Sequence, residues 1–353
     1  MKNFNLITVV FLIIASNATI SKAQEGNTTG ALEIFGSVDT YFKYDFDKHT
    51  NITSSGFTGD HNSVSLGMID LGLRKSVGKA SFLGEVSFGP RGQYRSLLNG
   101  DGNANNVDNS FHIQNLVVSY SLTDKWSVDA GFMGTFVGYE VISPSANFHY
   151  STSYLFGAGP FQNAGIKTSY SFTDNIQLMV GLFNDWNEYQ DLNGVSHFGS
   201  QLAYSPTENS SLYLNFLTGI SEGGETAYTS GTLIDLVGSY SFSDKVSLGL
   251  NAADYTQAAD GGYSGVALYP QYNFTENIAI GARAEYFKVK DVADVKGDDF
   301  TSFTLSGNFK HNGFAFIPEI RFDNSNNDVF LKQDLVTPKK NAAQFSLALV
   351  YSF

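Results

Sequence analysis

Six histidines are the first residues to consider for chemistry, because an imidazole can bind a metal ion or carry a proton near neutral pH. They are His49, His61, His112, His149, His197 and His311. None of them forms the HxH or HxxxH spacing that often places two ligands on one metal ion, and the chain has no cysteine. The sequence therefore predicts no metal site and no cofactor.

A serine lies two residues after one of these histidines, at Ser151 after His149. Nucleophilic catalysis needs such a pair to be oriented by a third group, usually a carboxylate. The spacing around this pair does not imply one. We therefore expect that the protein is not an enzyme.

Two sets of charged residues are better candidates, because opposed charges across a narrow opening would order water and sort polar solutes. The basic set is Arg74, Arg91, Arg95, Lys167, Arg283 and Arg321. The acidic set is Glu33, Asp39, Glu85, Asp129, Asp235, Glu285 and Glu319. Two interpretations remain open: the sets form facing walls of a channel, or their members pair with one another on neighbouring strands.

A further candidate is the segment 138–160, GYEVISPSANFHYSTSYLFGAGP. It is a long connection between alternating segments, yet it is too rich in aromatic residues for a solvated loop. Such a loop is expected to be buried, because burial of large rings is strongly favourable. Glu140, His149 and Tyr150 are the residues of this loop that we expect to line an opening.

Short turns define the elements that position these residues. A segment with a Ser/Thr-Asp/Glu-Asn/Lys centre recurs, which is typical of tight hairpin turns. Its copies are YSLTDKW from Tyr120, YSFTDNI from Tyr170, YSPTENS from Tyr204, YSFSDKV from Tyr240 and YNFTENI from Tyr272. The 32 to 50 residues from one copy to the next suit a strand, a longer loop and a second strand. Short turns at one end and long loops at the other are the layout of an outer-membrane barrel.

The segments between the turns alternate apolar and polar residues, as a barrel wall requires. In the first, Ile34, Val38 and Phe42 share one face, and Asp39 and Lys43 share the other. The predicted fold is an all-β, transmembrane, antiparallel up-and-down barrel of about 16 strands, with short periplasmic turns and long outer loops. The predicted strands are 31–46, 62–76, 79–90, 109–122, 125–137, 159–172, 175–186, 195–205, 210–220, 229–242, 245–256, 261–274, 277–290, 298–310, 313–323 and 340–353.

Two details of the strands lead to local predictions. In the second strand, Val64, Leu66 and Met68 are out of phase with the apolar residues from Ile69 onward, which predicts a bulge. Pro270 lies within a predicted strand and is expected at a bulge or near a rim, because proline cannot donate to the ladder. With 16 strands the lumen is wide enough for water, and segment 138–160 becomes the third outer loop.

The two ends of the chain carry export and assembly signals. Lys2, the apolar run from Leu6 to Ala15 and a small-x-small site before Gln24 predict a signal peptide over residues 1–23, leaving 24–353 as the barrel. At the other end, alternate apolar residues lead to Tyr351 and Phe353, which resembles the signal read by the barrel-assembly machinery. We therefore expect a multi-pass protein in the outer membrane of a Gram-negative bacterium.

Charge and composition limit the partners. The chain has 34 acidic and 21 basic residues, which argues against nucleic acid. The expected partners are the lipid bilayer and small hydrophilic solutes. A homotrimer is left open, since contacts between subunits and contacts with lipid are both apolar.

The run from Gly131 to Lys167 resembles the central motif of the putative β-barrel porin family 2, the OmpL-like barrels. The resemblance is carried by GYE at 138–140, NFHYS at 147–151, SYLF at 153–156 and Gly-Pro at 159–160. It implies an outer-membrane porin with no defined solute. In classical 16-stranded porins the third loop folds into the barrel and narrows the channel, and segment 138–160 resembles that arrangement in position. The alternative is a non-conducting barrel that binds a ligand or partner through its surface loops.

Overall fold

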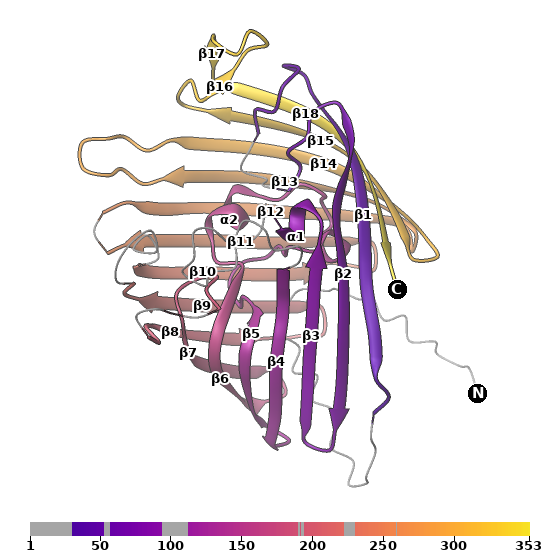
Figure 1. Ribbon diagram of the computed structural model, residues 1–353, viewed down its shortest axis with the longest axis vertical. Coiled ribbons are helices and arrows are strands. Elements are labelled where there is room, and N and C mark those ends of the chain that lie inside the picture. Colours follow the sequence, from indigo (N-terminus) through magenta and orange to yellow (C-terminus); the bar gives the residue numbers. More distant parts are fainter. Residues whose placement is uncertain are drawn as a thin grey trace.

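The computed structural model describes residues 30–52, 57–93, 112–189, 191, 194–221, 230–258 and 260–353. Its main feature is one closed antiparallel barrel of 16 strands (Figure 1). The barrel strands are β1 (Glu33–Asp45), β2 (Ser63–Val77), β3 (Ala80–Phe88), β4 (His112–Thr123), β5 (Trp126–Gly134), β6 (Gln162–Thr173), β7 (Ile176–Phe183), β8 (His197–Tyr204), β9 (Ser210–Gly219), β10 (Gly231–Ser241), β11 (Val246–Gln257), β12 (Gly262–Thr275), β13 (Ile278–Val289), β14 (Asp299–His311), β15 (Phe314–Ser325) and β18 (Asn341–Ser352). The fold prediction is confirmed, and each predicted strand overlaps one observed strand. The predicted signal peptide lies outside the described residues.

Each strand pairs with its neighbour in sequence, and the barrel closes where the last strand meets the first. The β1–β18 ladder runs from Ser37 opposite Ser352 to Asp45 opposite Gln344. At the end of the chain, the backbone N–H of Phe353 donates to the carbonyl of Gly36 at 3.1 Å, and the reverse bond is equally long. The first and last strands, β1 and β18, therefore close the barrel by pairing with each other.

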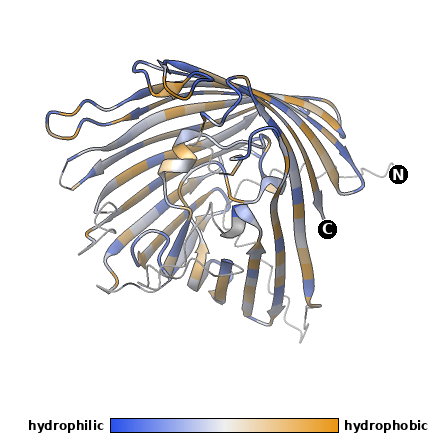
Figure 2. Cartoon of the chain, turned by 45° about the horizontal axis from the view of Figure 1, so that its top comes forward, coloured by the Kyte–Doolittle hydropathy of each residue, from blue (hydrophilic) through white to orange (hydrophobic). Residues whose placement is uncertain are grey.

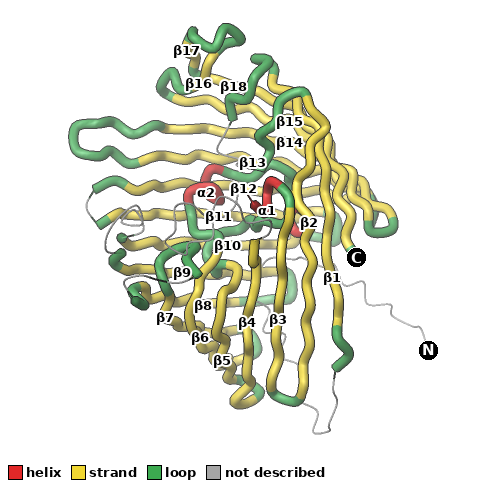
Figure 3. Tube along the Cα trace, viewed as in Figure 1, coloured by secondary structure: helices red, strands yellow, loops and turns green. Residues whose placement is uncertain are grey.

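The connections differ at the two ends of the barrel (Figure 3). At one end they are short, at 78–79, 124–125, 174–175, 205–209, 242–245, 276–277 and 312–313. At the other end they are mostly longer, at 46–62, 89–111, 135–161, 184–196, 220–230, 258–261, 290–298 and 326–340. The last of these loops contains a small hairpin of β16 (Phe330–Leu331) and β17 (Pro338–Lys339). Both chain ends of the barrel lie on the short-turn side.

Alternation along the strands separates an apolar outside from a polar inside (Figure 2). Outward side chains such as Ile34, Leu182 and Phe303 are about half exposed, whereas inward ones such as Asp39 and Lys43 are buried. Aromatic residues next to the short turns also point outward, and pairs such as Tyr240 and Phe242 pack edge to face with ring centres 4.8 Å apart. An exposed apolar band with aromatic residues at its edge suits contact with a bilayer.

The bulge predicted in the second strand is present, and it corrects the position of one side chain. Val38 pairs with Ile69 while Thr40 pairs with Leu66, so β2 has one extra residue at this point. The backbone N–H of Met68 donates to a carboxylate oxygen of Asp39 at 2.9 Å instead of to the ladder. Met68 therefore points inward and is buried, although its spacing from Leu66 suggested the lipid face.

Pro270 was expected at a bulge or near a rim; it is not at a bulge, but it pairs with Leu248, the third residue of β11, close to the short-turn end of the barrel. Its neighbours Leu268 and Gln271 keep one continuous register with β13, and the irregularity in this pair of strands comes later, between Asn273 and Thr275. The proline is tolerated without a bulge because it costs a single ladder donor, and its ring points outward.

The helices are short. They are α1 (Pro90–Gln93), the 3-10 turn η1 (Pro144–Ala146) and α2 (Tyr154–Ala158). None of the helices in the described part of the chain is long and apolar enough to cross a membrane.

Candidate functional site: the loop inside the barrel

The longest fully described loop, 135–161, enters the ring of strands between β5 and β6 (Figure 1). Its fold follows from local signals. Pro144 begins η1, where a missing N–H costs nothing. Ser153 caps α2, and its hydroxyl accepts a bond from the N–H of Phe156 at 3.0 Å. The side chain of Asn147 bonds both backbone groups of Val141, which closes the turn between them.

Apolar side chains of the loop contact three separate parts of the inner wall. Tyr154 and Leu155 join a large cluster with residues of β7 to β13. Tyr150, which has no exposed surface, packs with Tyr41 of β1 and with residues of β15 and β18. Ile142 and Phe156 pack with Met68 of β2. The loop therefore spans the interior and does not lie against one side only.

Wall carboxylates bind the loop backbone in pairs of hydrogen bonds. Glu319 of β15 accepts from the N–H groups of Tyr150 at 2.9 Å and Ser151 at 3.1 Å. Glu285 of β13 accepts from a second pair of backbone N–H groups, those of Tyr154 at 3.0 Å and Leu155 at 2.9 Å. Ionised acceptors make stronger hydrogen bonds than neutral ones. The two glutamates thus satisfy backbone groups that the loop cannot pair internally.

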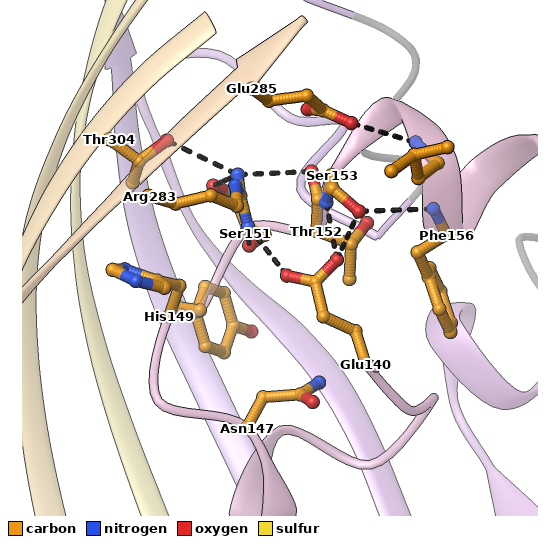
Figure 4. A network of polar contacts seen from close by, with 12 residues as sticks. Glu140, Asn147, His149, Ser151, Thr152, Ser153, Phe156, Arg283, Glu285 and Thr304 are labelled. Atoms are coloured by element: carbon orange, nitrogen blue, oxygen red, sulfur yellow. Dashed lines mark hydrogen bonds and ion pairs between the residues drawn. The ribbon is translucent and has the colours of Figure 1, made fainter. Parts of the chain in front are cut away.

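An arginine connects two distant parts of the same loop (Figure 4). Arg283 of β13 contacts the Glu140 carboxylate at 2.7 Å and donates to the Ser151 carbonyl at 2.6 Å and the Thr152 carbonyl at 3.2 Å. Glu140 in turn accepts from the N–H of Ser153 at 2.7 Å and from its hydroxyl. Arg283 has no exposed surface. Burial of this charge is tolerated because its donors meet a carboxylate and carbonyls together.

Two further arginines hold the loop from other sides. Arg321 of β15 donates to the Thr152 carbonyl at 2.7 Å while pairing with Asp323 at 2.8 Å. Arg91 of α1 donates to the carbonyl of Ile142 at 3.0 Å, and its guanidinium lies over the ring of Tyr150 at 4.8 Å. Both side chains are completely buried. Their guanidinium groups therefore hold the loop in place by hydrogen bonds and are not accessible to a solute.

His149 does not form a catalytic arrangement. Its Nδ1 lies 2.7 Å from the hydroxyl of Ser306, not of Ser151, and that hydroxyl donates to Glu319 at 2.8 Å. Because the Ser306 hydroxyl gives its proton to Glu319, the ring of His149 is not placed to activate either Ser306 or Ser151 as a nucleophile. Burial, together with the charge of Arg283, holds the pKa of this loop histidine well below its usual range. His149 is a neutral structural residue.

The predicted positions of the loop residues need correction. Glu140, His149 and Tyr150 were expected to line an opening, but all three are buried against the wall, with exposed fractions of 6%, 2% and 0%. The expectation failed because the sequence shows which residues are on the loop but not which wall groups they meet. Glu140 meets Arg283, and the Tyr150 hydroxyl meets Asp39.

Four other predicted charged residues lie next to charges of opposite sign on neighbouring strands. Arg74 lies near the short-turn end of β2, paired with the equally exposed Glu33, and so is away from the loop. Asp129 of β5 and Lys167 of β6 are directly opposite each other in the ladder. Arg95 lies outside the described residues.

The two sets of charges therefore do not form an acidic and a basic wall. Opposite charges alternate on single strands, as in Glu319, Arg321 and Asp323, all of which point inward from β15. The paired interpretation describes them better. Asp323 and Ser153, which the sequence reasoning missed, could have been found from the Glu-x-Arg-x-Asp alternation and from the serine that precedes α2.

The cavities of the described structure do not add a ligand site. One cavity of about 880 Å³ is a groove lined by outward-facing apolar residues such as Leu268, Phe303 and Phe322, which places it against lipid. No group of three or more histidine or acidic residues in the described part of the chain is arranged to hold a metal ion.

Comparison with known structures shows the fold. OmpF of Salmonella typhi, solved with daunomycin, is similar with a TM-score of 0.65 at 12% identity, covering 92% of this chain and 98% of that one. An anion-selective porin from Comamonas acidovorans gives 0.61 at 14%, covering 92% and 100%. OmpT of Vibrio cholerae, described as a trimer form, gives 0.59 at 12%, covering 92% and 100%. No curated protein sequence matches the chain.

The family comparison is more specific. The model described as "Putative beta-barrel porin-2, OmpL-like" matches residues 31–353, which is nearly the whole chain. Together with the fold, it indicates an outer-membrane β-barrel of a Gram-negative bacterium and points to a porin, not an enzyme. The chain belongs to the OmpL-like, putative beta-barrel porin-2 family.

Proposed function

We propose that this porin forms a water-filled channel for the passive diffusion of small hydrophilic solutes, and that loop 135–161 constricts it. The closed barrel and the family support a pore. The polar inner face supports water as its content, because inward positions carry Ser, Asn, Gln and charged residues. No covalent step is part of this function.

The observation that carries the proposal is that Glu319 and Glu285 each accept two hydrogen bonds from the backbone of the loop. A loop that could move freely in the lumen would make few hydrogen bonds to the wall. Here two carboxylates and the buried Arg283 satisfy its backbone on the wall opposite its origin. Such bonding makes the loop a fixed obstacle whose position decides what passes.

Single-channel conductance in planar bilayers tests the proposal. Deleting Ser145–Ser153 removes the tip of the loop, and the open-channel current is expected to increase. Deleting 327–337 from the last outer loop is the matched control, and its current should equal that of the unaltered protein. An unchanged current after the first deletion would place the constriction elsewhere.

A non-conducting barrel is the second candidate, and the tight packing of the loop favours it. One void between the loop and β10 to β12 has a volume of about 10 Å³, which is about the space of one water molecule. If pure, folded protein gives no stable current, the surface loops become the functional region. Swelling of proteoliposomes in sugars, amino acids and salts then separates slow permeation from none.

Export and assembly complete the proposal. Cleavage before Gln24, recognition of Tyr351 and Phe353 by the barrel-assembly machinery, and a homotrimer like the form described for OmpT are each proposed for this chain. The N-terminal sequence of the mature protein and its mass in mild detergent test the first and last of these.

A further inference from the structure

Apolar side chains of the loop pack against two opposite parts of the inner wall. On the β10 to β13 side, Tyr139 stacks on Tyr269 with ring centres 4.2 Å apart, and Tyr154 stacks on Phe300 at 4.7 Å. A separate void of about 10 Å³ lies between the loop and β10 to β12, with Leu155, Asp235 and Tyr263 among its lining residues. On the β15, β18 and β1 side, the buried Tyr150 fills the space against apolar residues. Both regions are thus packed with buried apolar side chains.

The inward polar residues of β3 to β5 are different. Glu85, Asn115 and Asp129 are all partly exposed, whereas the charged residues under the loop, such as Arg283 and Glu319, are 0% and 2% exposed. We call the inner surface of β3 to β5 the polar arc. Among the described residues, it is where charged inward side chains near the loop are partly exposed.

Hydrogen bonds place this arc at the level of the constriction. Asn115 accepts from the N–H of Gly134, where the loop begins, at 2.9 Å, and donates to Glu85 at 2.6 Å. Asp129 lies farther from the loop and directly opposite Lys167, which offsets its charge. Glu85 is thus the carboxylate of this arc with no basic residue opposite it, since its ladder partners are Gly72 and Asn115.

We propose that the ion path runs off-centre, between the loop and β3 to β5, and that Glu85 sets a preference for cations. This inference rests on the proposed channel function. A carboxylate on a low-dielectric wall raises the local concentration of cations and excludes anions. Asp129 contributes less because of Lys167.

Reversal potentials in a salt gradient test the role of Glu85. At pH 8.5, where the Glu85 carboxylate is ionised, the ratio of cation to anion permeability in Glu85→Gln is expected to fall about twofold or more at 0.1 M salt, and less at 1 M, where screening is strong. Glu276→Gln, which removes an exposed carboxylate in the turn after β12, should leave the ratio unchanged. An unchanged ratio in Glu85→Gln at low salt would overturn the assignment, as would an effect that does not weaken with salt.

Cysteine accessibility tests the path itself, and the chain offers a clean background because it has no cysteine. Asn115→Cys should react with a cationic methanethiosulfonate reagent and lose current. Ala267→Cys, completely buried on the sealed side, should neither react nor lose current. Absence of labelling at position 115 by mass measurement, or full current after labelling, would overturn the path. If the unaltered protein itself carries no current, the proposed function fails; if it conducts and only these variants behave otherwise, the inference fails alone.

Discussion

Arg283 and Glu140 form a fully buried ion pair, with 2.7 Å between Nη1 and Oε1, that joins strand β13 to the entrance of the loop across the barrel. The same guanidinium also bonds the far part of the loop at Ser151 and Thr152. One side chain therefore fixes two parts of the loop that are more than ten residues apart.

Replacing Arg283 with methionine should destabilise the barrel strongly, because Glu140 would be left buried without its partner. Loss of one member of a buried pair typically costs about 3–5 kcal/mol. Urea unfolding of the refolded protein measures the loss, and increased noise in the open-channel current should accompany it. Arg74→Met removes an exposed pair with Glu33 of the same chemical type and should have little effect. Equal effects of the two substitutions would show that the internal pair is not an anchor.

A cysteine pair can test whether the loop moves during conduction. The hydroxyl oxygens of Ser37 on β1 and Ser143 on the loop are 3.2 Å apart, so cysteines at these two positions bring their side-chain ends together for cross-linking. If the loop is a fixed constriction, oxidation of the Ser37→Cys, Ser143→Cys protein should leave the current unchanged. Ser211→Cys with Ser239→Cys bridges two wall strands, where the oxygens are 2.7 Å apart, and is the control. Loss of current only in the oxidised loop pair, with recovery on reduction, would mean that the loop must move.

The terminal aromatic residue should control assembly. The ring of Phe353 lies over Gly36, so close that a Cβ there would be 2.8 Å from a ring atom. Phe353→Ala should slow formation of the closed barrel and lower its amount in the outer membrane. Phe316→Ala removes another exposed, lipid-facing ring and should assemble normally. The heat-dependent shift of the folded protein on gels measures both, and equal assembly of the two variants would contradict a special role for the terminus.

Acid should weaken the loop through His149. Its pKa is lowered in the folded protein, so the unfolded chain takes up the proton first as the pH falls below about 6.5. The unfolding free energy should then decrease by at most about 1.4 kcal/mol per pH unit, relative to the variant His149→Asn. Asparagine is the comparison because it keeps a donor toward Ser306. Urea unfolding at several pH values between 8 and 5 checks this, and parallel curves for the two proteins would exclude the histidine as the cause.

The strands were predictable because each depends on local information. Turn segments such as that from Tyr170 mark the ends, and alternation between them marks the faces. The bulge was visible as a phase change next to Met68, but its cause, the Asp39 carboxylate, was not. Glu140 and Arg283 are 143 residues apart, and their meeting depends on barrel register and loop direction together. Sequence patterns carry neither, so the charged residues were recognised while their partners were not.

The separation in sequence between the loop and its anchors imposes an order on folding. The N–H of Tyr150 bonds Glu319, which comes 169 residues later. Contacts between such distant residues form late, because the entropy of closing a long loop must be overcome first. Glu319 lies on β15, which pairs with the closing strand β18, so this contact can form only when most of the barrel strands are in place. Ordering of the loop is therefore expected to accompany closure of the barrel, and a chain that stops before β15 would lack both the Glu319 and the Arg321 contacts to the loop.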